Sequence, residues 1–133
     1  MEKIFSKHWN SSKQPRKQRK YLANAPLHLR NSFVSSNLSK DLREKHLKRS
    51  LPLRKNDIVK VMKGKFKGKK GKVLNIDLKE SMIEVEGLHV QKKDGSKANV
   101  KMRPSNLQIT EISGEDKKRN KSKETNKSQK QEK

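Results

Sequence analysis

The chain has 133 residues, of which 36 are Lys or Arg and 14 are Asp or Glu, giving a formal net charge of +22. Only 28% of the residues are hydrophobic and 4% aromatic, too few to fill one globule of this length. The excess charge disfavours a compact state unless a polyanion neutralises it, so nucleic acid is the leading partner class. No apolar run approaches the roughly 18 residues that a membrane span needs. The absence of cysteine excludes disulfides, thiolate metal sites and cysteine nucleophiles, and suits a cytoplasmic protein.

Charge and apolar content divide the chain into three segments. Residues 1–50 have a net charge of +10, and we interpret them as a basic N-terminal extension. Residues 51–112 have a net charge of +8 and hold the dense apolar pattern expected of a folded domain. Residues 113–133 have a net charge of +4 and no apolar side chain, which predicts a disordered, charged tail.

The N-terminal extension has too few apolar residues to form a core of its own. Two short helices are predicted in it, one over residues 25–34 with Pro26 near its first turn. The other covers residues 38–47, with Ser39 as the N-cap. The basic run KQPRKQRK over residues 13–20 is expected to be part of an extended arm. That arm should become ordered by packing on the domain and on a polyanion.

Residues 51–112 alternate apolar and polar side chains with a period of two, which predicts five short, half-buried strands. The expected inward side chains are Val59 and Val61, then Leu74, Ile76 and Leu78, then Ile83 and Val85, then Val100 and Met102, and finally Leu107 and Ile109. The Asp94-Gly95 pair between two of these strands is typical of a hairpin. A mainly β fold is therefore predicted, with about five strands in a small, strongly bent barrel.

The stretch KGKFKGKKGK over residues 63–72, which we name the lysine turn, joins the first two of these strands. Its glycine spacing does not match a P-loop, because Lys69 and Val73 stand where that motif needs its second glycine. Glycines let a backbone approach phosphates closely, and lysines placed against phosphates release condensed counterions. The lysine turn is therefore predicted to bind the nucleic-acid backbone.

Three aromatic residues in basic surroundings have two interpretations each. Phe66, at the tip of the lysine turn, could stack on an unpaired base or fold back to cap the barrel. Trp9 and Tyr21 lie in the basic arm, where stacking on bases competes with packing against the protein. The sequence leaves both alternatives open at all three positions.

Catalytic and metal-binding patterns are weak in this sequence. The four histidines stand singly, and no pair has a spacing that could share a metal ion. Glu84 and Glu86 lie two residues apart on one strand, where ion pairs with lysine are a simpler interpretation than acid/base catalysis. We therefore predict no enzyme activity, no metal, no cofactor and no small-molecule substrate.

Three stretches together resemble a known family. IVKVMKGKFKGKKGKVLNID over residues 58–77 resembles the KOW motif, a strand–loop–strand unit with a K-G-x-x-K/R-G turn. VEGLHVQKKDGSKANVKMRPSNLQI over residues 85–109 is similar to the second half of a universal large-subunit ribosomal protein, numbered 24 in bacteria and archaea and 26 in eukaryotes. Residues 13–57 resemble the N-terminal extension of the archaeal and eukaryotic branch, and are closer to the archaeal one. The resemblance covers about residues 12–112.

This resemblance implies an SH3-like barrel in a structural protein of the cytoplasmic large ribosomal subunit. It also implies direct binding to the 5′ domain of large-subunit rRNA, early entry into assembly, and a place near the tunnel exit. The implied state is a monomer within the ribosome, with neighbouring ribosomal proteins as partners and no membrane contact. The residues expected to contact rRNA are Lys13, Arg16, Lys17, Arg19, Lys20, Tyr21, His28, Arg30, Arg54, Lys63, Lys65, Phe66, Lys67, Lys69, Lys70, Lys72, Lys92, Lys93 and Arg103, while Gly64, Gly68 and Gly71 shape the turn.

One alternative is a transcription elongation factor of the NusG/Spt5 type, which also carries a KOW unit. That family places an α/β domain of roughly a hundred residues before the unit, whereas only about 50 basic, apolar-poor residues precede it here. The other alternative is an RNA-processing enzyme that uses the KOW unit for targeting. The sequence offers no catalytic constellation for it.

Overall fold

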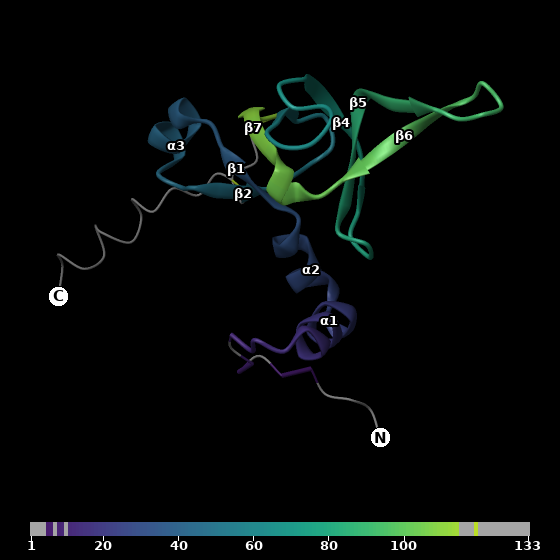
Figure 1. Cartoon of the computed structure of the whole chain (residues 1–133). Coiled ribbons are helices and arrows are strands. Elements are labelled where there is room, and N and C mark those ends of the chain that lie inside the picture. The colour runs from purple at the N-terminus through teal and green to yellow at the C-terminus, as the bar shows by residue number, and fades with distance from the viewer. Residues whose placement is uncertain (1–4, 7, 10, 115–118, 120–133) are drawn as a thin grey trace.

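The computed structural model describes residues 5, 6, 8, 9, 11–114 and 119 (Figure 1). Its helices are α1 (Pro15–Asn24), α2 (Leu27–Phe33), α3 (Lys40–His46) and the short 3₁₀ turn η1 (Pro104–Asn106). Its strands are β1 (Ser35–Leu38), β2 (Ser50–Pro52), β3 (Ile58–Val61), β4 (Lys70–Asp77), β5 (Met82–Gln91), β6 (Lys97–Met102) and β7 (Leu107–Glu111). The described chain is thus mainly β, as the sequence predicted, with α1 and α2 below the sheet in the view of Figure 1.

The seven strands form one sheet in the order β2-β1-β7-β3-β4-β5-β6. Neighbouring strands are antiparallel except for β1 and β7, which run parallel. Strand β4 joins β3 and the strands beyond it to β5 and β6, because Lys70–Lys72 pair with β3 and the residues from Val73 onward pair with β5. Within the described residues no ladder joins β6 to β2, so the sheet is open and the predicted closure into a barrel is not confirmed.

A single apolar core is enclosed by this sheet. Leu51 of β2 and Met102 of β6, from opposite ends of the strand order, belong to the same cluster of buried side chains. The sheet must therefore curl strongly to bring its ends together across the core. Among the predicted inward side chains, those buried are Val59, Val61, Ile83, Val85, Met102, Leu107 and Ile109, and those half-buried are Ile76, Leu78 and Val100.

A bulge in β4 reverses the expected direction of one side chain. The sequence predicted Leu74 as an inward residue, but Leu74 is 44% exposed and its neighbour Val73 is buried. The pairing with β5 explains the difference, because the residues on either side of Leu74 oppose adjacent residues of the partner strand. Leu74 is thus the inserted residue, and one insertion shifts a period-two pattern onto the other face.

Gly71 allows β4 to pass close to β5. A Cβ atom placed on Gly71 would lie 2.5 Å from the carbonyl oxygen of Glu86 and 2.8 Å from Cγ1 of Val85. Any side chain at position 71 would therefore have to displace the backbone of β5. Gly64 and Gly68 are needed for a different reason, since their φ angles of +94° and +89° lie in the left-handed region.

Strands β1 and β2 were not predicted from the sequence. They lie at the end of the N-terminal extension and its junction with the domain, where β1 pairs with β2 on one side and with β7 on the other. Their inward side chains include a serine, Ser36, whose hydroxyl donates a hydrogen bond of 2.6 Å to the carbonyl oxygen of Pro104. Strands of four and three residues with a polar inward position give no clear period-two signal. The extension is therefore tied into the sheet by backbone pairing.

The described residues of the extension form three helices, of which the sequence predicted two. Helices α2 and α3 confirm the prediction, and Ser39 occupies the N-cap position of α3, although its hydroxyl makes no capping hydrogen bond. Helix α1 replaces the extended arm expected over residues 13–20. It begins at Pro15, whose fixed φ and missing N–H suit the first helical position.

The carboxylate of Asp57 is the centre of a buried hydrogen-bond cluster. Its side chain has no exposed surface, and it accepts hydrogen bonds from the backbone N–H groups of Arg54 at 2.8 Å and Ser113 at 2.9 Å. The guanidinium of Arg119 binds both carboxylate oxygens, at 3.0 and 2.5 Å. The loop before β3, the end of β7 and Arg119 are thereby held at one carboxylate.

Arg119 belongs to the segment that the sequence predicted to be a disordered tail. Its side chain is nearly fully buried, and its carbonyl oxygen accepts a hydrogen bond of 3.1 Å from Lys48. Disorder is therefore not confirmed at Arg119. The rest of the predicted tail beyond Gly114 lies outside the described residues.

Candidate nucleic-acid interface

Helix α1 carries four of the cations predicted over residues 13–20, and Lys13 lies just before its first residue. Lys13, Arg16, Lys17, Arg19 and Lys20 are all exposed. Residues three and four apart share a helix face, and two faces of α1 line two separate cavities. One cavity is lined by Lys17, Lys20, Tyr21 and Asn24 of α1, and the other by Arg19, Leu22 and Ala23.

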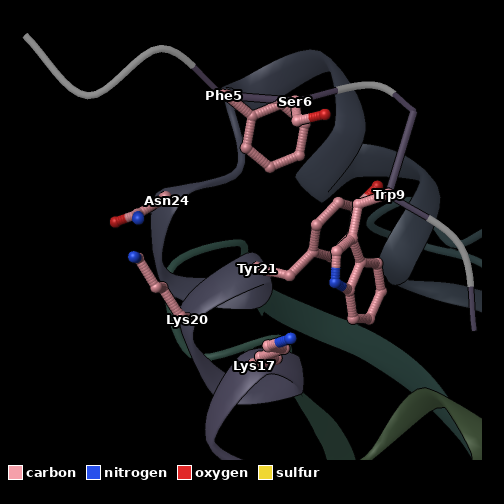
Figure 2. A pocket seen from close by; sticks show the side chains of 7 residues that line it. All are labelled: Phe5, Ser6, Trp9, Lys17, Lys20, Tyr21 and Asn24. Carbon is pink, nitrogen blue, oxygen red and sulfur yellow. The ribbon is translucent and has the colours of Figure 1, made fainter. Parts of the chain in front are cut away.

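The first of these, which we name the aromatic cavity, has a volume of about 330 Å³ and is completed by Phe5, Ser6 and Trp9 (Figure 2). Trp9 stacks on Tyr21 with ring centroids 4.5 Å apart and an interplanar angle of 20°. Phe5 approaches Tyr21 at 4.8 Å, and Phe33 of α2 lies 6.0 Å away. Tyr21 is thus the centre of an aromatic cluster, whereas the sequence left it open whether Trp9 and Tyr21 pack on the protein.

The second cavity, which we name the arm–sheet cavity, has a volume of about 430 Å³ and is lined by α1, by the turn that joins β4 to β5 and by the η1 region. It brings together Arg19 of the arm and Arg103 of the domain, two predicted contacts that are 84 positions apart in sequence. Lys79, in the turn between β4 and β5, also lines it and was not predicted. No local pattern could have identified Lys79, because its place beside the arm depends on how α1 packs.

Two predicted arm contacts have different roles in the structure. Arg30 donates hydrogen bonds from Nε to the carbonyl oxygen of Ala25 at 2.8 Å and from Nη2 to that of Ala23 at 2.6 Å. Its guanidinium therefore satisfies carbonyl groups at the end of α1 and fixes the angle between α1 and α2. His28 is exposed on α2, where it is accessible to a partner.

The lysine turn is a compact loop with all of its lysines exposed. The carbonyl oxygen of Val61 accepts a hydrogen bond of 2.8 Å from the N–H of Gly68, and the N–H of Val61 donates to the carbonyl oxygen of Lys69 at 2.9 Å. At the base of the turn, the N–H of Met62 donates to the carbonyl oxygen of Asn106 in η1 at 2.8 Å. The exposed lysines of the lysine turn are Lys63, Lys65, Lys67 and Lys69 on the loop and Lys70 and Lys72 at the start of β4.

Phe66 folds back from the tip of the lysine turn. It is half-buried and packs against the hydrophobic core. The ammonium group of Lys69 lies 5.3 Å from the centre of its ring, within the range of a cation–π contact. Of the two interpretations that the sequence left open, the structure therefore has Phe66 capping the core.

The hairpin of β5 and β6 projects from the rest of the molecule (Figure 1). Lys92 and Lys93 are exposed near its tip, where Gly95 adopts a φ of +85° as expected for an Asp-Gly turn. The hydroxyl of Ser96 donates to the carboxylate of Asp94 at 2.7 Å and its backbone N–H donates at 2.9 Å, which lowers the pKa of Asp94. The short turn is thus held by its own side chains.

Arg54 lies in the loop that leads into β3. It is exposed, and it shares a cavity lining with Asn31 of α2 and with its neighbour Lys55. Its position beside α2 places a domain cation next to the extension, as Arg103 does in the arm–sheet cavity.

Most of these cations form no ion pair within the part of the chain that the structure describes. Leaving Arg54 aside, none of the predicted Lys and Arg contacts forms an ion pair among the described residues. By contrast, Lys101 lies 2.7 Å from Glu80 and 3.8 Å from Asp77, and the bond to Glu80 raises the pKa of Lys101. Apart from Arg30, which binds backbone carbonyl groups, and Arg54, the predicted Lys and Arg contacts therefore have no ion pair in the described residues that would compete with an external anion.

The described residues hold neither a metal-binding cluster nor a membrane-spanning helix. In the part of the chain that the structure describes, no three His, Cys, Asp or Glu side chains gather closely enough to hold a metal ion. None of the helices in that part is long and apolar enough to cross a membrane.

Comparison with known proteins decides the family. Residues 12–125 match the family model that describes ribosomal protein L26 of eukaryotes and its archaeal counterpart, ribosomal protein L24. The chain belongs to this ribosomal protein family. It is also 50% identical over 109 residues to the large ribosomal subunit protein uL24 of Methanosphaera stadtmanae, covering 82% of this chain and 93% of that protein. As a member of the family, the chain is a structural, non-enzymatic protein of the large subunit of the cytoplasmic ribosome. The family match favours this interpretation over a transcription elongation factor.

Proposed function

We propose that the chain binds large-subunit rRNA directly and holds separate rRNA segments together as the subunit assembles. The N-terminal extension (residues 1–50) supplies one contact surface through α1, and the domain (residues 51–112) supplies the other through the lysine turn. The site of binding is the 5′ domain of the rRNA, the protein enters assembly early as a monomer, and its neighbours are the proteins around the tunnel exit. The resemblance of residues 12–112 to the family supports these details.

The observation that carries the proposal is the exposed state of the cations on both surfaces. Six lysines within the ten residues of the lysine turn repel one another, and among the described residues none of them forms an ion pair with an acidic side chain. Such a loop is stable chiefly when an external polyanion neutralises it. Gly64 and Gly68 add no side chain to the turn, so phosphate groups can approach its backbone closely.

The curl of the sheet contributes by setting the positions of these surfaces. We propose that the curled sheet corresponds to the SH3-like barrel of the family, with β1 and β2 added beside β7. The N–H of Met62 bonds to Asn106, and Arg103 shares the arm–sheet cavity with Arg19. The base of the lysine turn is therefore hydrogen-bonded to η1, and the arm lines a cavity beside the same stretch. Two cationic surfaces on one chain can bind two RNA segments and bring them together.

Charge reversal tests this proposal. Lys67→Glu combined with Lys69→Glu should weaken rRNA binding and lower the slope of log K against log salt concentration by about 1 for each phosphate that is no longer bound. The matched control is Lys40→Glu combined with Lys45→Glu, which changes the net charge equally on exposed positions of α3. Equal weakening by both pairs would show that net charge alone governs binding. Circular dichroism should confirm that both variants stay folded.

A further inference from the structure

We propose that the aromatic cavity receives one unpaired nucleobase of the bound RNA, stacked against the ring of Trp9. This inference rests on the proposed function, because it names a recognition element within an RNA-binding surface. The observation that supports it separately is the convergence of three aromatic rings and two lysines around one open cavity of about 330 Å³.

The cavity has walls from two parts of the chain. Figure 2 shows Phe5 and Trp9 on the segment that precedes α1, facing Tyr21 on the helix itself. Tyr21 is already packed against Trp9 and Phe5, so it serves as a fixed support. Trp9 is half-buried, which leaves part of its ring surface accessible. A flat apolar ring surface on a fixed support suits the face of a base.

The polar groups around the cavity match the rest of a nucleotide. Lys17 and Lys20 are exposed at its rim on the same face of α1, where they can contact the phosphates on either side of an inserted base. Asn24 is one further turn along that face, and its amide offers both a donor and an acceptor to a base edge. Among the described residues, no acidic side chain lines the cavity. This combination of stacking surface, amide and cations favours an unpaired nucleotide over an aliphatic ligand.

Trp9 provides its own reporter, because the chain has a single tryptophan. We would titrate the full-length protein with a short single-stranded RNA, with the same strand made abasic, and with a duplex RNA of equal length. The single strand should quench the tryptophan fluorescence, and the abasic and duplex RNAs should bind with little quenching. Equal quenching by the abasic strand would contradict the proposal, because phosphates alone would then explain the signal. Quenching by a poly-glutamate peptide equal to that by RNA would assign the cavity to an acidic protein partner instead.

Substitution of Trp9 provides the second readout. Trp9→Ala should weaken single-strand binding by about 5- to 150-fold, equivalent to the ~1–3 kcal/mol of one base–aromatic stack. Trp9→Phe should keep most of the affinity, and neither variant should change duplex binding. Equal loss toward single-stranded and duplex RNA would overturn the inference. If circular dichroism shows that Trp9→Ala loses helix α1, the proposal is tested by the affinity of Trp9→Phe and by the fluorescence quenching of the unmodified protein.

The same experiments separate this inference from the proposed function. Anisotropy of labelled rRNA measures binding without relying on Trp9. Binding of rRNA without quenching would retain the proposed function and reject the base in the aromatic cavity. Absence of rRNA binding in the anisotropy experiment would reject both.

Discussion

The buried pair of Asp57 and Arg119 gives a quantitative prediction about stability. Asp57→Asn removes the negative charge that faces a guanidinium whose side chain is 2% exposed. Removing one partner of a buried ion pair costs about 3–5 kcal/mol, because the other charge keeps its desolvation penalty. Arg119→Met should cost less, about 1.5–3 kcal/mol, since Asp57 retains the backbone N–H donors of Arg54 and Ser113. Because small domains have a total stability of roughly 5–15 kcal/mol, Asp57→Asn should remove a large part of it.

Urea unfolding followed by circular dichroism measures these differences. The control is Glu111→Gln, which removes one negative charge at an exposed position of β7 and should change the free energy of unfolding by less than about 0.5 kcal/mol. The double variant Asp57→Asn with Arg119→Met should cost less than the sum of the two single variants, because they share one interaction. If the free energy of unfolding of Asp57→Asn lies within about 1 kcal/mol of that of the unmodified protein, Arg119 is not paired with Asp57 in the folded protein.

Two further predictions concern the domain. Gly71→Val should destabilise the fold by about 3 kcal/mol, because its Cβ would lie 2.5 Å from the carbonyl oxygen of Glu86. Gly64→Ala, with open space around it, should cost only the ~1–2 kcal/mol of left-handed backbone strain. Equal losses of stability for the two variants in thermal unfolding would contradict the close approach of Gly71 to β5. The lowered pKa of Asp94 means that the hydrogen bonds from Ser96 stabilise the hairpin turn above pH 3.8 and are lost as the pH falls through the lower folded value. An NMR titration should give an Asp94 midpoint below 3.8, and Ser96→Ala should raise it; an unchanged midpoint would argue against the bond.

Much of the sheet could be predicted because its core strands alternate regularly. Val59, Val61, Ile83 and Val85 face inward in the structure as the period of two indicated. Leu74 was predicted wrongly, because a one-residue bulge leaves no trace in the apolar pattern and depends on how β4 packs against β5. The sequence thus predicted which strands exist better than where their register shifts.

The extension was harder to predict, because tertiary contacts determine its structure. β1 and β2 are too short to show a periodic pattern, and they exist because β7 offers β1 an edge to pair with. Helix α1 and the residues just before it are dominated by Lys and Arg, so this stretch resembles an unstructured basic arm. The aromatic cluster around Tyr21 gives the helix a packing partner.

The exposure of the candidate contact residues could be expected from the sequence, whereas the contacts that some of them make inside the protein could not. Charge density correctly placed exposed lysines on the lysine turn and on α1. Arg30 has a structural role in the hydrogen bonding of α1, and Phe66 packs on the core. Neither outcome could be read from residue type, since both depend on which backbone groups and apolar surfaces the fold leaves nearby. Lys79 reaches the arm–sheet cavity for the same reason.

The most direct test of the proposed function compares two RNAs at about 0.2 M salt, where non-specific phosphate contacts are strongly weakened. The full-length protein would be titrated with the 5′ domain of large-subunit rRNA and with an unrelated duplex of the same length, and binding followed by filter retention. Direct recognition predicts that the rRNA domain keeps much tighter binding than the duplex. Equal affinity for the two RNAs would contradict the proposal and reduce the basic surface to a non-specific polyanion site.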